Sequence, residues 1–322
     1  MSRLDFEKPI LELEHKIFEL KGIHSKKRVN IAPEIKKLDE KLAKLRTQIY
    51  ENLTPWQRIQ IARHPDRPYT YDYIRLMAED FLEVHGDRLF ADDYAMVAGF
   101  ATIDKQKVFI IGHQKGRDVK ENVMRNFGCA HPEGYRKAMR LMKMAEKFGL
   151  PILILIDTPG AYPGIGAEER GQAQAIATNL MQMVEVATPI VAVVIGEGGS
   201  GGALGIGVAD RVLILQHAYY SVISPEGCAS ILWRNSVRAP DAAKALKIMG
   251  EDLLEFGMVD EIIEEPLGGA HRSPETISAA VKKAVLRHIK KLSTFSKEEI
   301  LANRYERFRK IGKFEEEAPV KK

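Results

Sequence analysis

The stretch VAVVIGEGGSGGALGIG, residues 191–207, holds the most unusual turn of this chain. Its first five residues are apolar and mostly β-branched, which predicts a buried strand over 191–195. Glycine fills five of the next seven positions, which indicates a backbone that turns where a Cβ atom would collide. Ala203 and Leu204 then open a helix. Unpaired N–H groups at the helix start, together with the helix dipole, predict a binding place for an anion or a developing oxyanion.

One interpretation of this turn is a dinucleotide-binding fingerprint, because Gly196, Gly198 and Gly201 match G-x-G-x-x-G after a strand. Such a site also needs an acidic residue about 20 positions further on, at the end of the next strand, to hold the ribose. The next predicted strand, RVLILQ, ends in Gln216, and the nearby acid, Asp210, precedes it. The sequence therefore argues against a dinucleotide site.

A second interpretation is the nucleophile elbow of serine hydrolases, since residues 198–202 satisfy G-x-S-x-G around Ser200. It requires a histidine and an acid later in the chain, and the candidates are His217, His271, His288, Asp241, Asp252 and Asp260. A third interpretation is an oxyanion hole made only of backbone amides. A plain structural alternative is a turn that lets a helix pack closely on a sheet. These alternatives remain open at this point.

A second glycine-rich segment, PILILIDTPGAYPGIGAEERGQ, occupies residues 151–172. Residues 151–156 predict a fully buried strand of a parallel sheet, followed by the turn Asp157-Thr158-Pro159-Gly160. Glu168 and Glu169 then begin a helix of about seventeen residues that leads to the strand at 191. The order predicts a right-handed βαβ unit. Both glycine loops then emerge at the carboxyl ends of neighbouring parallel strands, where α/β sheets bind ligands.

Several long motifs resemble one family. DTPGAYPG (157–164), the glycine turn and YYSVISPEGCASILW (219–233) are similar to the α subunit of the carboxyltransferase component of bacterial-type acetyl-CoA carboxylase. The similarity extends from the N-terminal helices to about residue 310 through RHPDRPYTYDYI (63–74), HGDRLFADD (85–93) and EPLGGAHR (265–272). The resemblance implies an α/β, crotonase-like fold, a spiral of ββα units in which backbone amides hold an enolate or a related oxyanion.

The resemblance also implies a reaction, the transfer of a carboxyl group from carboxybiotin to acetyl-CoA, giving malonyl-CoA for fatty acid synthesis. It places the biotin oxyanion hole on the backbone of Gly201 and Gly202. Biotin itself takes the methyl proton, so no side-chain base is expected. The alternative is a self-sufficient crotonase-like acyl-CoA hydratase or hydrolase, or a serine hydrolase. The substrate-binding positions expected around the hole are Gly160, Ala161, Tyr162, Gly198 and Gly199.

Partners follow from the same resemblance. In the family, the oxyanion hole for the thioester enolate lies on a zinc-containing β subunit, so an α2β2 heterotetramer with a shared site is expected. Biotin is expected on a biotin carboxyl carrier protein and is carboxylated by a separate biotin carboxylase, since this chain contains no P-loop. No metal is expected in this chain, because Cys129 and Cys228 are far apart and read as free thiols.

Composition agrees with a cytoplasmic α/β protein. The chain has 322 residues, and its hydrophobic share of 45% is enough for a large core. The net charge of +4 is modest and does not predict nucleic-acid binding. The acidic N-terminal residues Asp5, Glu7, Glu12 and Glu14 argue against a secretory signal. No apolar run approaches the ~20 residues of a membrane span.

The first fifty residues are a different kind of sequence, with apolar side chains that repeat every three or four positions on both sides of a break at 22–33. They predict an antiparallel helical hairpin over residues 1–55, with a role in subunit contact. Residues 56–292 are expected to form the crotonase-like carboxyltransferase domain. Residues 293–322 are expected to form a C-terminal helix, with a capping box at Ser296 and Glu299, and a charged tail.

The region between the hairpin and the first glycine segment is predicted in less detail. Residues 56–84 read as helices, and residues 95–103 and 107–115 read as a β-hairpin. The loop that follows carries four cations, which either meet phosphates or are simply solvated: Lys115, Arg117, Lys120 and Arg125.

Overall fold

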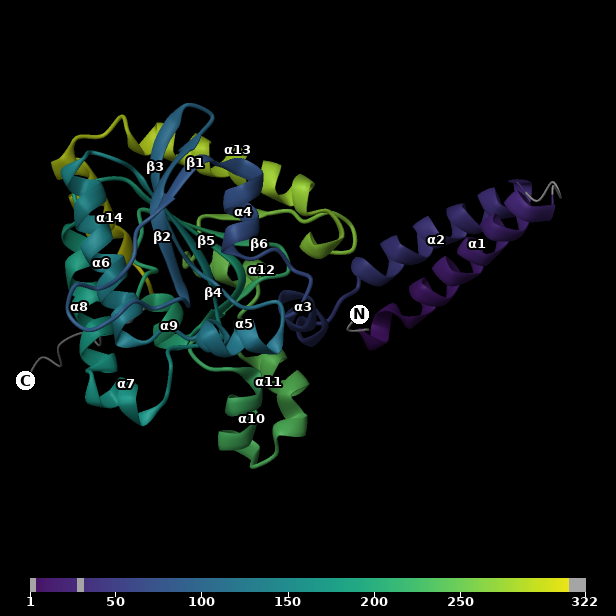
Figure 1. Cartoon of the computed structure of the whole chain (residues 1–322). Helices are drawn as coiled ribbons and strands as arrows, with labels where there is room; N and C mark the ends of the chain where they lie inside the picture. The colour runs from purple at the N-terminus through teal and green to yellow at the C-terminus, as the bar shows by residue number, and fades with distance from the viewer. Residues whose placement is uncertain (1–3, 28–31, 313–322) are drawn as a thin grey trace, which may run out of the picture.

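The computed structural model describes residues 4–27 and 32–312. Most of them form an α/β domain, from which a hairpin of two helices, α1 (Lys8–Lys27) and α2 (Ala32–Tyr50), projects to one side (Figure 1). The charged tail predicted after Phe314 lies outside the described residues.

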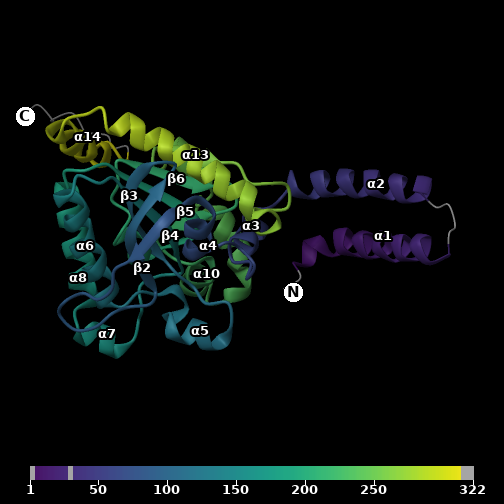
Figure 2. The same cartoon turned by 45° about the horizontal axis from the view of Figure 1, so that its top comes forward.

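The predicted N-terminal hairpin is present, but the break between its helices is shorter than expected. Gly22 lies inside α1 and Pro33 lies in the first turn of α2. At the base of the hairpin, the hydroxyl of Tyr50 donates to the carboxylate of Glu7, and the guanidinium of Arg272 lies 3.3 Å from the same carboxylate. Figure 2 shows the two helices side by side. Their apolar seam is formed by buried Leu4, Ile10, Ile17, Ile35, Leu42 and Tyr50.

A mixed sheet forms the centre of the α/β domain. Strands β1, β2 and β3 pair antiparallel, and the path from β3 through β4, β5 and β6 to β8 is parallel. Every residue of β4 and β5 is buried, as their continuous apolar sequences predict. The bounds are β1 (Glu79–Glu83), β2 (Met96–Ile103), β3 (Gln106–His113), β4 (Ile152–Thr158), β5 (Ile190–Gly199), β6 (Arg211–Leu215), β7 (Tyr219–Ser221) and β8 (Glu261–Ile263).

Helices surround this sheet. Helices α6 and α8 lie side by side against one part of it, whereas α13 crosses it next to α4 (Figures 1 and 2). The helices after the hairpin are α3 (Pro55–Ala62), α4 (Thr70–Met77), α5 (Val119–Met124), α6 (Pro132–Lys147), α7 (Ile165–Glu169), α8 (Gln172–Glu185), α9 (Ser200–Leu204), α10 (Pro225–Trp233), α11 (Ala239–Ala245), α12 (Gly250–Glu255), α13 (Pro274–Leu292) and α14 (Lys297–Arg309).

Two of the local predictions are wrong. Residues 56–84 are not all helical, because β1 follows α4 and pairs with β2. The single helix expected from Glu168 is divided into α7 and α8, because Gly171 adopts the left-handed conformation with φ of 79°. The β-hairpin of β2 and β3 is confirmed, and so is the capping box of Ser296 and Glu299 at α14.

Two fully buried ion pairs tie distant segments to the sheet. Arg67 binds Glu265 in a bidentate pair at 2.6 and 2.9 Å and also donates to the carbonyl of Ile195. Arg304 of α14 pairs with Asp210, and its remaining N–H groups donate to backbone carbonyls near the end of α8. Because unpaired buried charges are costly, the Arg304–Asp210 pair specifies where the C-terminal helix docks, and the Arg67–Glu265 pair holds the segment after α3 against β5.

Candidate active site

The two glycine-rich segments meet at the carboxyl edge of the sheet, as the sequence predicts. β4 and β5 are parallel neighbours, and Thr158 lies opposite Gly198 in the strand register. The loop after β4 and the turn after β5 therefore leave the sheet side by side. This edge is the candidate site.

The turn itself begins later than the sequence suggests. β5 does not end at Ile195 but continues through Gly199, and Gly198 and Gly199 pair with Tyr220 and Ser221 of β7. These two glycines are thus buried strand residues. The turn begins at Ser200, which is exposed and has φ of 50°, an uncommon conformation for a residue with a side chain.

The glycines of this segment allow neighbouring backbone to pack closely, rather than giving the chain an unusual conformation. Among the residues from 196 to 202, only Ser200 has a positive φ. A Cβ atom added to Gly199 would lie 2.2 Å from the carbonyl oxygen of Pro159. One added to Gly202 would lie 2.4 Å from the carbonyl carbon of Gly160. Gly201 is different, because a Cβ atom there would meet only Ile176, at an ordinary 3.6 Å.

The facing loop is held by its own hydrogen bonds. The hydroxyl of Thr158 donates to the carbonyl of Gly160 and accepts the Gly160 N–H. The Tyr162 N–H donates to the carbonyl of Ala130, and the side chain of Gln172 donates to the Tyr162 carbonyl. Gly160, Ala161 and Tyr162 are half-buried along this loop. The structure thus brings the predicted residues of the two loops together.

A small, mostly apolar cavity of about 230 Å³ adjoins the turn. Ser200 and Gly201 form one side of it, and the remaining wall comes from Leu204, Tyr220, Ser221, Val222, Leu253 and Met258. The helix α9 that follows the turn has five residues, so hydrogen-bond donation here depends on individual amides rather than on a long helix dipole.

A cluster of buried and half-buried side chains lies on and beside the strands that lead to the two glycine loops, and the sequence did not predict it. The ammonium of Lys115 lies 2.6 Å from the carboxylate of Asp157 and 2.9 Å from that of Glu197. Glu197 also binds Arg63 at 2.7 Å and accepts a hydrogen bond of 2.6 Å from the hydroxyl of Tyr219. We call these five residues the ion cluster. It joins β4, β5 and β7 to the segments that follow β3 and α3.

Electrostatics keep the cluster charged. The cations Lys115 and Arg63 lower the pKa of Glu197 to about 2 against the opposing effect of burial. The two carboxylates raise the pKa of Lys115 above its usual value, again against burial. The N–H of Glu197 also donates to Asp157, which holds β4 and β5 together where their register shifts. The cluster therefore fixes the strand ends that carry both glycine loops.

The four cations predicted on a loop after β3 do not form a phosphate site as a group, and the segment is partly helical, since Lys120 lies in α5. Lys115 belongs to the ion cluster. Arg117 pairs with Asp72 and lies over the ring of Tyr69, and Arg125 binds Glu121. Among the four, Lys120 is exposed and makes no ion pair within the described residues.

The geometry disfavours a serine hydrolase. Within the described part of the chain, none of the candidate histidines hydrogen-bonds to Ser200. The ring of His271 stacks on that of His64 at 4.0 Å, and His288 lies 2.7 Å from Glu261. His113, fully buried, has its pKa lowered to about 3 by burial and by Lys115, so it is neutral.

The dinucleotide interpretation also fails. Asp210, the one nearby acid, is buried, accepts the backbone N–H of Ile190 and pairs with Arg304. It is not available to a ribose.

The described residues contain no group of three or more His, Cys, Asp or Glu side chains placed to hold a metal ion. Cys129 and Cys228 are free thiols, and burial raises the pKa of Cys129 to about 11. Across residues 4–27 and 32–312, no helix is both long and apolar enough to span a membrane.

Comparison with known proteins identifies the class. The model of the family described as "Acetyl co-enzyme A carboxylase carboxyltransferase-like" matches residues 3–312, so the chain belongs to this family. Curated relatives named acetyl-coenzyme A carboxylase carboxyl transferase subunit alpha are similar along nearly their whole length. The protein of Geobacter metallireducens is 55% identical over 98% of both chains, and that of Thermus thermophilus is 55% identical over 97% of this chain and 99% of its own.

Solved structures support the fold. A chain of the transcarboxylase 12S hexamer superposes with a TM-score of 0.58 at 21% identity, covering 72% of this chain and 44% of that chain. A Pseudomonas malonate decarboxylase hetero-tetramer in complex with coenzyme A gives a TM-score of 0.55 at 15% identity, covering 66% of this chain and 85% of that one. The predicted crotonase-like fold is therefore confirmed.

Proposed function

We propose that this chain is the α subunit of an acetyl-CoA carboxylase carboxyltransferase. In this proposal it takes part in moving a carboxyl group from carboxybiotin to the methyl carbon of acetyl-CoA, giving malonyl-CoA. The observation that carries the proposal is the 55% identity over 98% of both chains with a relative named for that subunit. The position of the glycine turn at the carboxyl edge of the sheet supports it independently.

The backbone amides of Gly201 and Gly202 are our candidates for the catalytic donors. They would hydrogen-bond to the ureido oxygen of biotin as negative charge gathers there, and removing one such donor typically costs ~2.7–4 kcal/mol of barrier. The fit to such a group rests on Gly201, which is half-buried and lines the apolar cavity, whereas Gly202 is buried and packs so closely on the facing loop that a Cβ atom would lie 2.4 Å from Gly160. When bound, biotin supplies the carboxyl group.

The other predicted residues take supporting positions in this proposal. Gly160, Ala161 and Tyr162 line the facing loop and would contact the substrate. Gly198 and Gly199 would act through the strand, because their lack of a Cβ atom lets β5 approach Pro159 and Tyr219 closely. The ion cluster holds both loops in place.

The partners belong to the proposal as well. A zinc-containing β subunit would supply the oxyanion hole for the thioester enolate, in an α2β2 heterotetramer with a shared site. Biotin would arrive on a biotin carboxyl carrier protein and be carboxylated by a separate biotin carboxylase. We place this assembly in the cytoplasm, without membrane or nucleic-acid partners. The hairpin of residues 1–55 would contact another subunit, beside a catalytic domain over 56–292 and a C-terminal segment over 293–322.

Dependence on the β subunit tests the proposal. The isolated chain, incubated with malonyl-CoA and free biotin, should show no useful decarboxylation, since half of the required donors are missing and an enolate without donors is too high in energy. Addition of the β subunit should produce activity and a heterotetramer in gel filtration. Robust turnover of an acyl-CoA by the isolated chain would instead favour the self-sufficient hydratase or hydrolase.

A further inference from the structure

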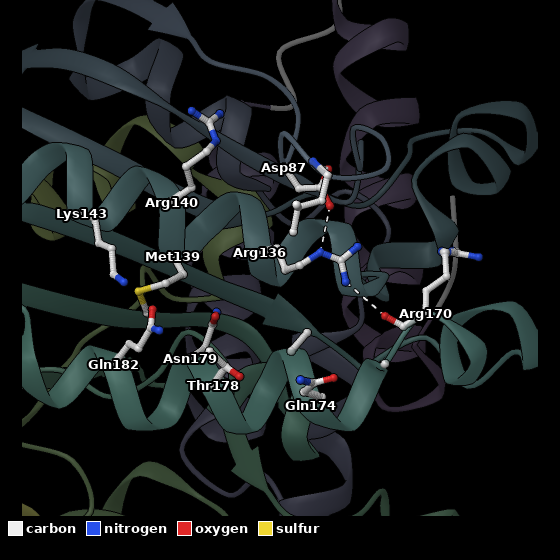
Figure 3. A pocket seen from close by; sticks show the side chains of 13 residues that line it. Asp87, Arg136, Met139, Arg140, Lys143, Arg170, Gln174, Thr178, Asn179 and Gln182 are labelled. Carbon is white, nitrogen blue, oxygen red and sulfur yellow. Dashed lines mark hydrogen bonds and ion pairs between the residues drawn. The ribbon is translucent and has the colours of Figure 1, made fainter.

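A groove of about 540 Å³ runs between α6 and α8, outside the glycine loops (Figure 3). Its two walls differ in chemistry, as Figure 3 shows along the two ribbons. The α6 wall is cationic and the α8 wall carries uncharged hydrogen-bonding groups at four-residue spacing. These side chains are Arg136, Arg140 and Lys143 on α6, and Gln174, Thr178 and Gln182 on α8.

The charges that line this α6–α8 groove are not balanced. Arg136 is neutralised by Asp87 and by Glu133, which it shares with Arg170. Arg140 instead donates to backbone carbonyls, among them that of Gly86 at 2.8 Å. Lys143 is exposed and makes no ion pair within the described residues. Lys143 therefore leaves an unbalanced positive charge on the groove, whereas the guanidinium of Arg140 is turned away from α8 toward the carbonyl of Gly86 (Figure 3).

One end of the groove, at Arg170, is connected to the candidate site through His131 and Tyr162. Helices α6 and α8 each lead to the amino end of a parallel strand, β4 and β5, so both helices begin near the carboxyl edge. At that end the guanidinium of Arg170 lies 3.2 Å from the ring of His131, which packs against the ring of Tyr162 at 4.1 Å. Tyr162 lies on the loop that faces Gly202. A ligand along the groove would thus point toward the glycine turn.

We propose that the α6–α8 groove docks an extended, acidic segment of the protein that carries biotin. The cationic wall would pair with its carboxylates, and the amide and hydroxyl groups of α8 would hydrogen-bond to its backbone. Docking there places the carrier at the Tyr162 end, from which the tethered biotin reaches the turn. This inference rests on the proposed function and deepens it, by naming the surface that recognises the carrier.

The test is the variant Lys143→Glu/Gln182→Glu, which makes the groove more negative. Within the described residues, neither side chain makes a hydrogen bond or an ion pair, so the substitutions remove no such internal contact. The matched control is Lys283→Glu/Gln106→Glu, which makes the same change of charge on α13 and β3, at residues that do not line the groove. Both are assembled with the β subunit. The KM is measured for biotinylated carrier domain, for free biotin and for malonyl-CoA, and the Kd for carrier domain is measured without turnover.

The groove variant should raise the KM and the Kd for carrier domain about tenfold or more. The values for free biotin and malonyl-CoA should stay within about twofold, as should all values of the control. Unchanged carrier binding would overturn the inference. So would a raised KM for malonyl-CoA, which would assign the groove to the acyl-CoA, or a loss of the heterotetramer, which would assign it to a subunit contact. If the unsubstituted complex turns over nothing, the proposed function fails, while the Kd comparison still decides the groove.

Discussion

The ion cluster and the glycine turn lie close together on one strand, with Glu197 three positions before Ser200, but the two regions are built in opposite ways. In the ion cluster, charged side chains point inward and satisfy one another, with Lys115 held between Asp157 and Glu197. The turn, by contrast, contains mostly glycine, and Gly202 packs directly against the backbone of Gly160. Glu197 sits between glycines 196 and 198, so one strand serves both regions.

The contrast teaches how a chain can present a charge-stabilising site without an exposed charged residue. The charged side chains of the ion cluster hold the ends of the strands in place. The backbone amides that follow these strand ends are the proposed catalytic groups. If this division holds, damage to the ion cluster should lower stability first, and damage to the turn should lower catalysis first. Three substitutions test this division, from the largest expected effect to the smallest.

The largest effect is expected from Lys115→Met. It leaves Asp157 and Glu197 buried without their shared cation, and breaking a buried pair in this way typically costs about 3–5 kcal/mol of stability. Urea unfolding should show this loss, and activity of the assembled complex should fall with it. The control is Lys120→Met, at an exposed lysine of α5, which should change stability by less than about 0.5 kcal/mol. Equal stability of the two variants would contradict a holding role for the ion cluster.

A smaller change in stability and a large change in rate are expected from Gly202→Ala. Its Cβ atom must push the turn away from Gly160, which moves the proposed donors and should lower kcat about 10²–10³-fold, with an overpacking cost of about 1–3 kcal/mol. Gly201→Ala, at the other proposed donor, is the comparison variant, because its Cβ atom meets only Ile176 at ordinary distance and leaves the amide N–H in place. Steady-state kinetics of the two complexes should therefore differ. Similar kcat values for both variants would contradict the claim that the close packing of Gly202 on Gly160 positions the catalytic amides.

Sequence reasoning predicted the fold wherever a local signal and the tertiary structure agree. The apolar runs of β4 and β5, the hairpin of β2 and β3 and the capping box at Ser296 are of this kind. β1 was missed, because its identity as a strand comes from pairing with β2 rather than from its own sequence. The break at Gly171 was missed because a single glycine does not reveal whether it takes a left-handed conformation.

The candidate site was predictable only in part, for the same reason. Glycine spacing locates the turn, but it does not show that Gly202, unlike Gly201, lies under Gly160, since that contact joins residues far apart in sequence. The ion cluster could not be predicted from the sequence either, although Lys115 and Asp157 were both singled out there. Their pairing depends on β3 and β4 lying side by side, and Glu197 gave no signal among its glycines.

The smallest effect, and the most direct test of the central claim, is expected from Ser200→Ala. The claim is that backbone amides, not a side-chain nucleophile, do the chemistry of this turn. The hydroxyl of Ser200 is then dispensable, and kcat/KM of the assembled complex for malonyl-CoA and biotin should stay within roughly tenfold of the unsubstituted value. A loss of several orders of magnitude, together with labelling of Ser200 by a fluorophosphonate that the substitution abolishes, would contradict the claim and identify a serine nucleophile.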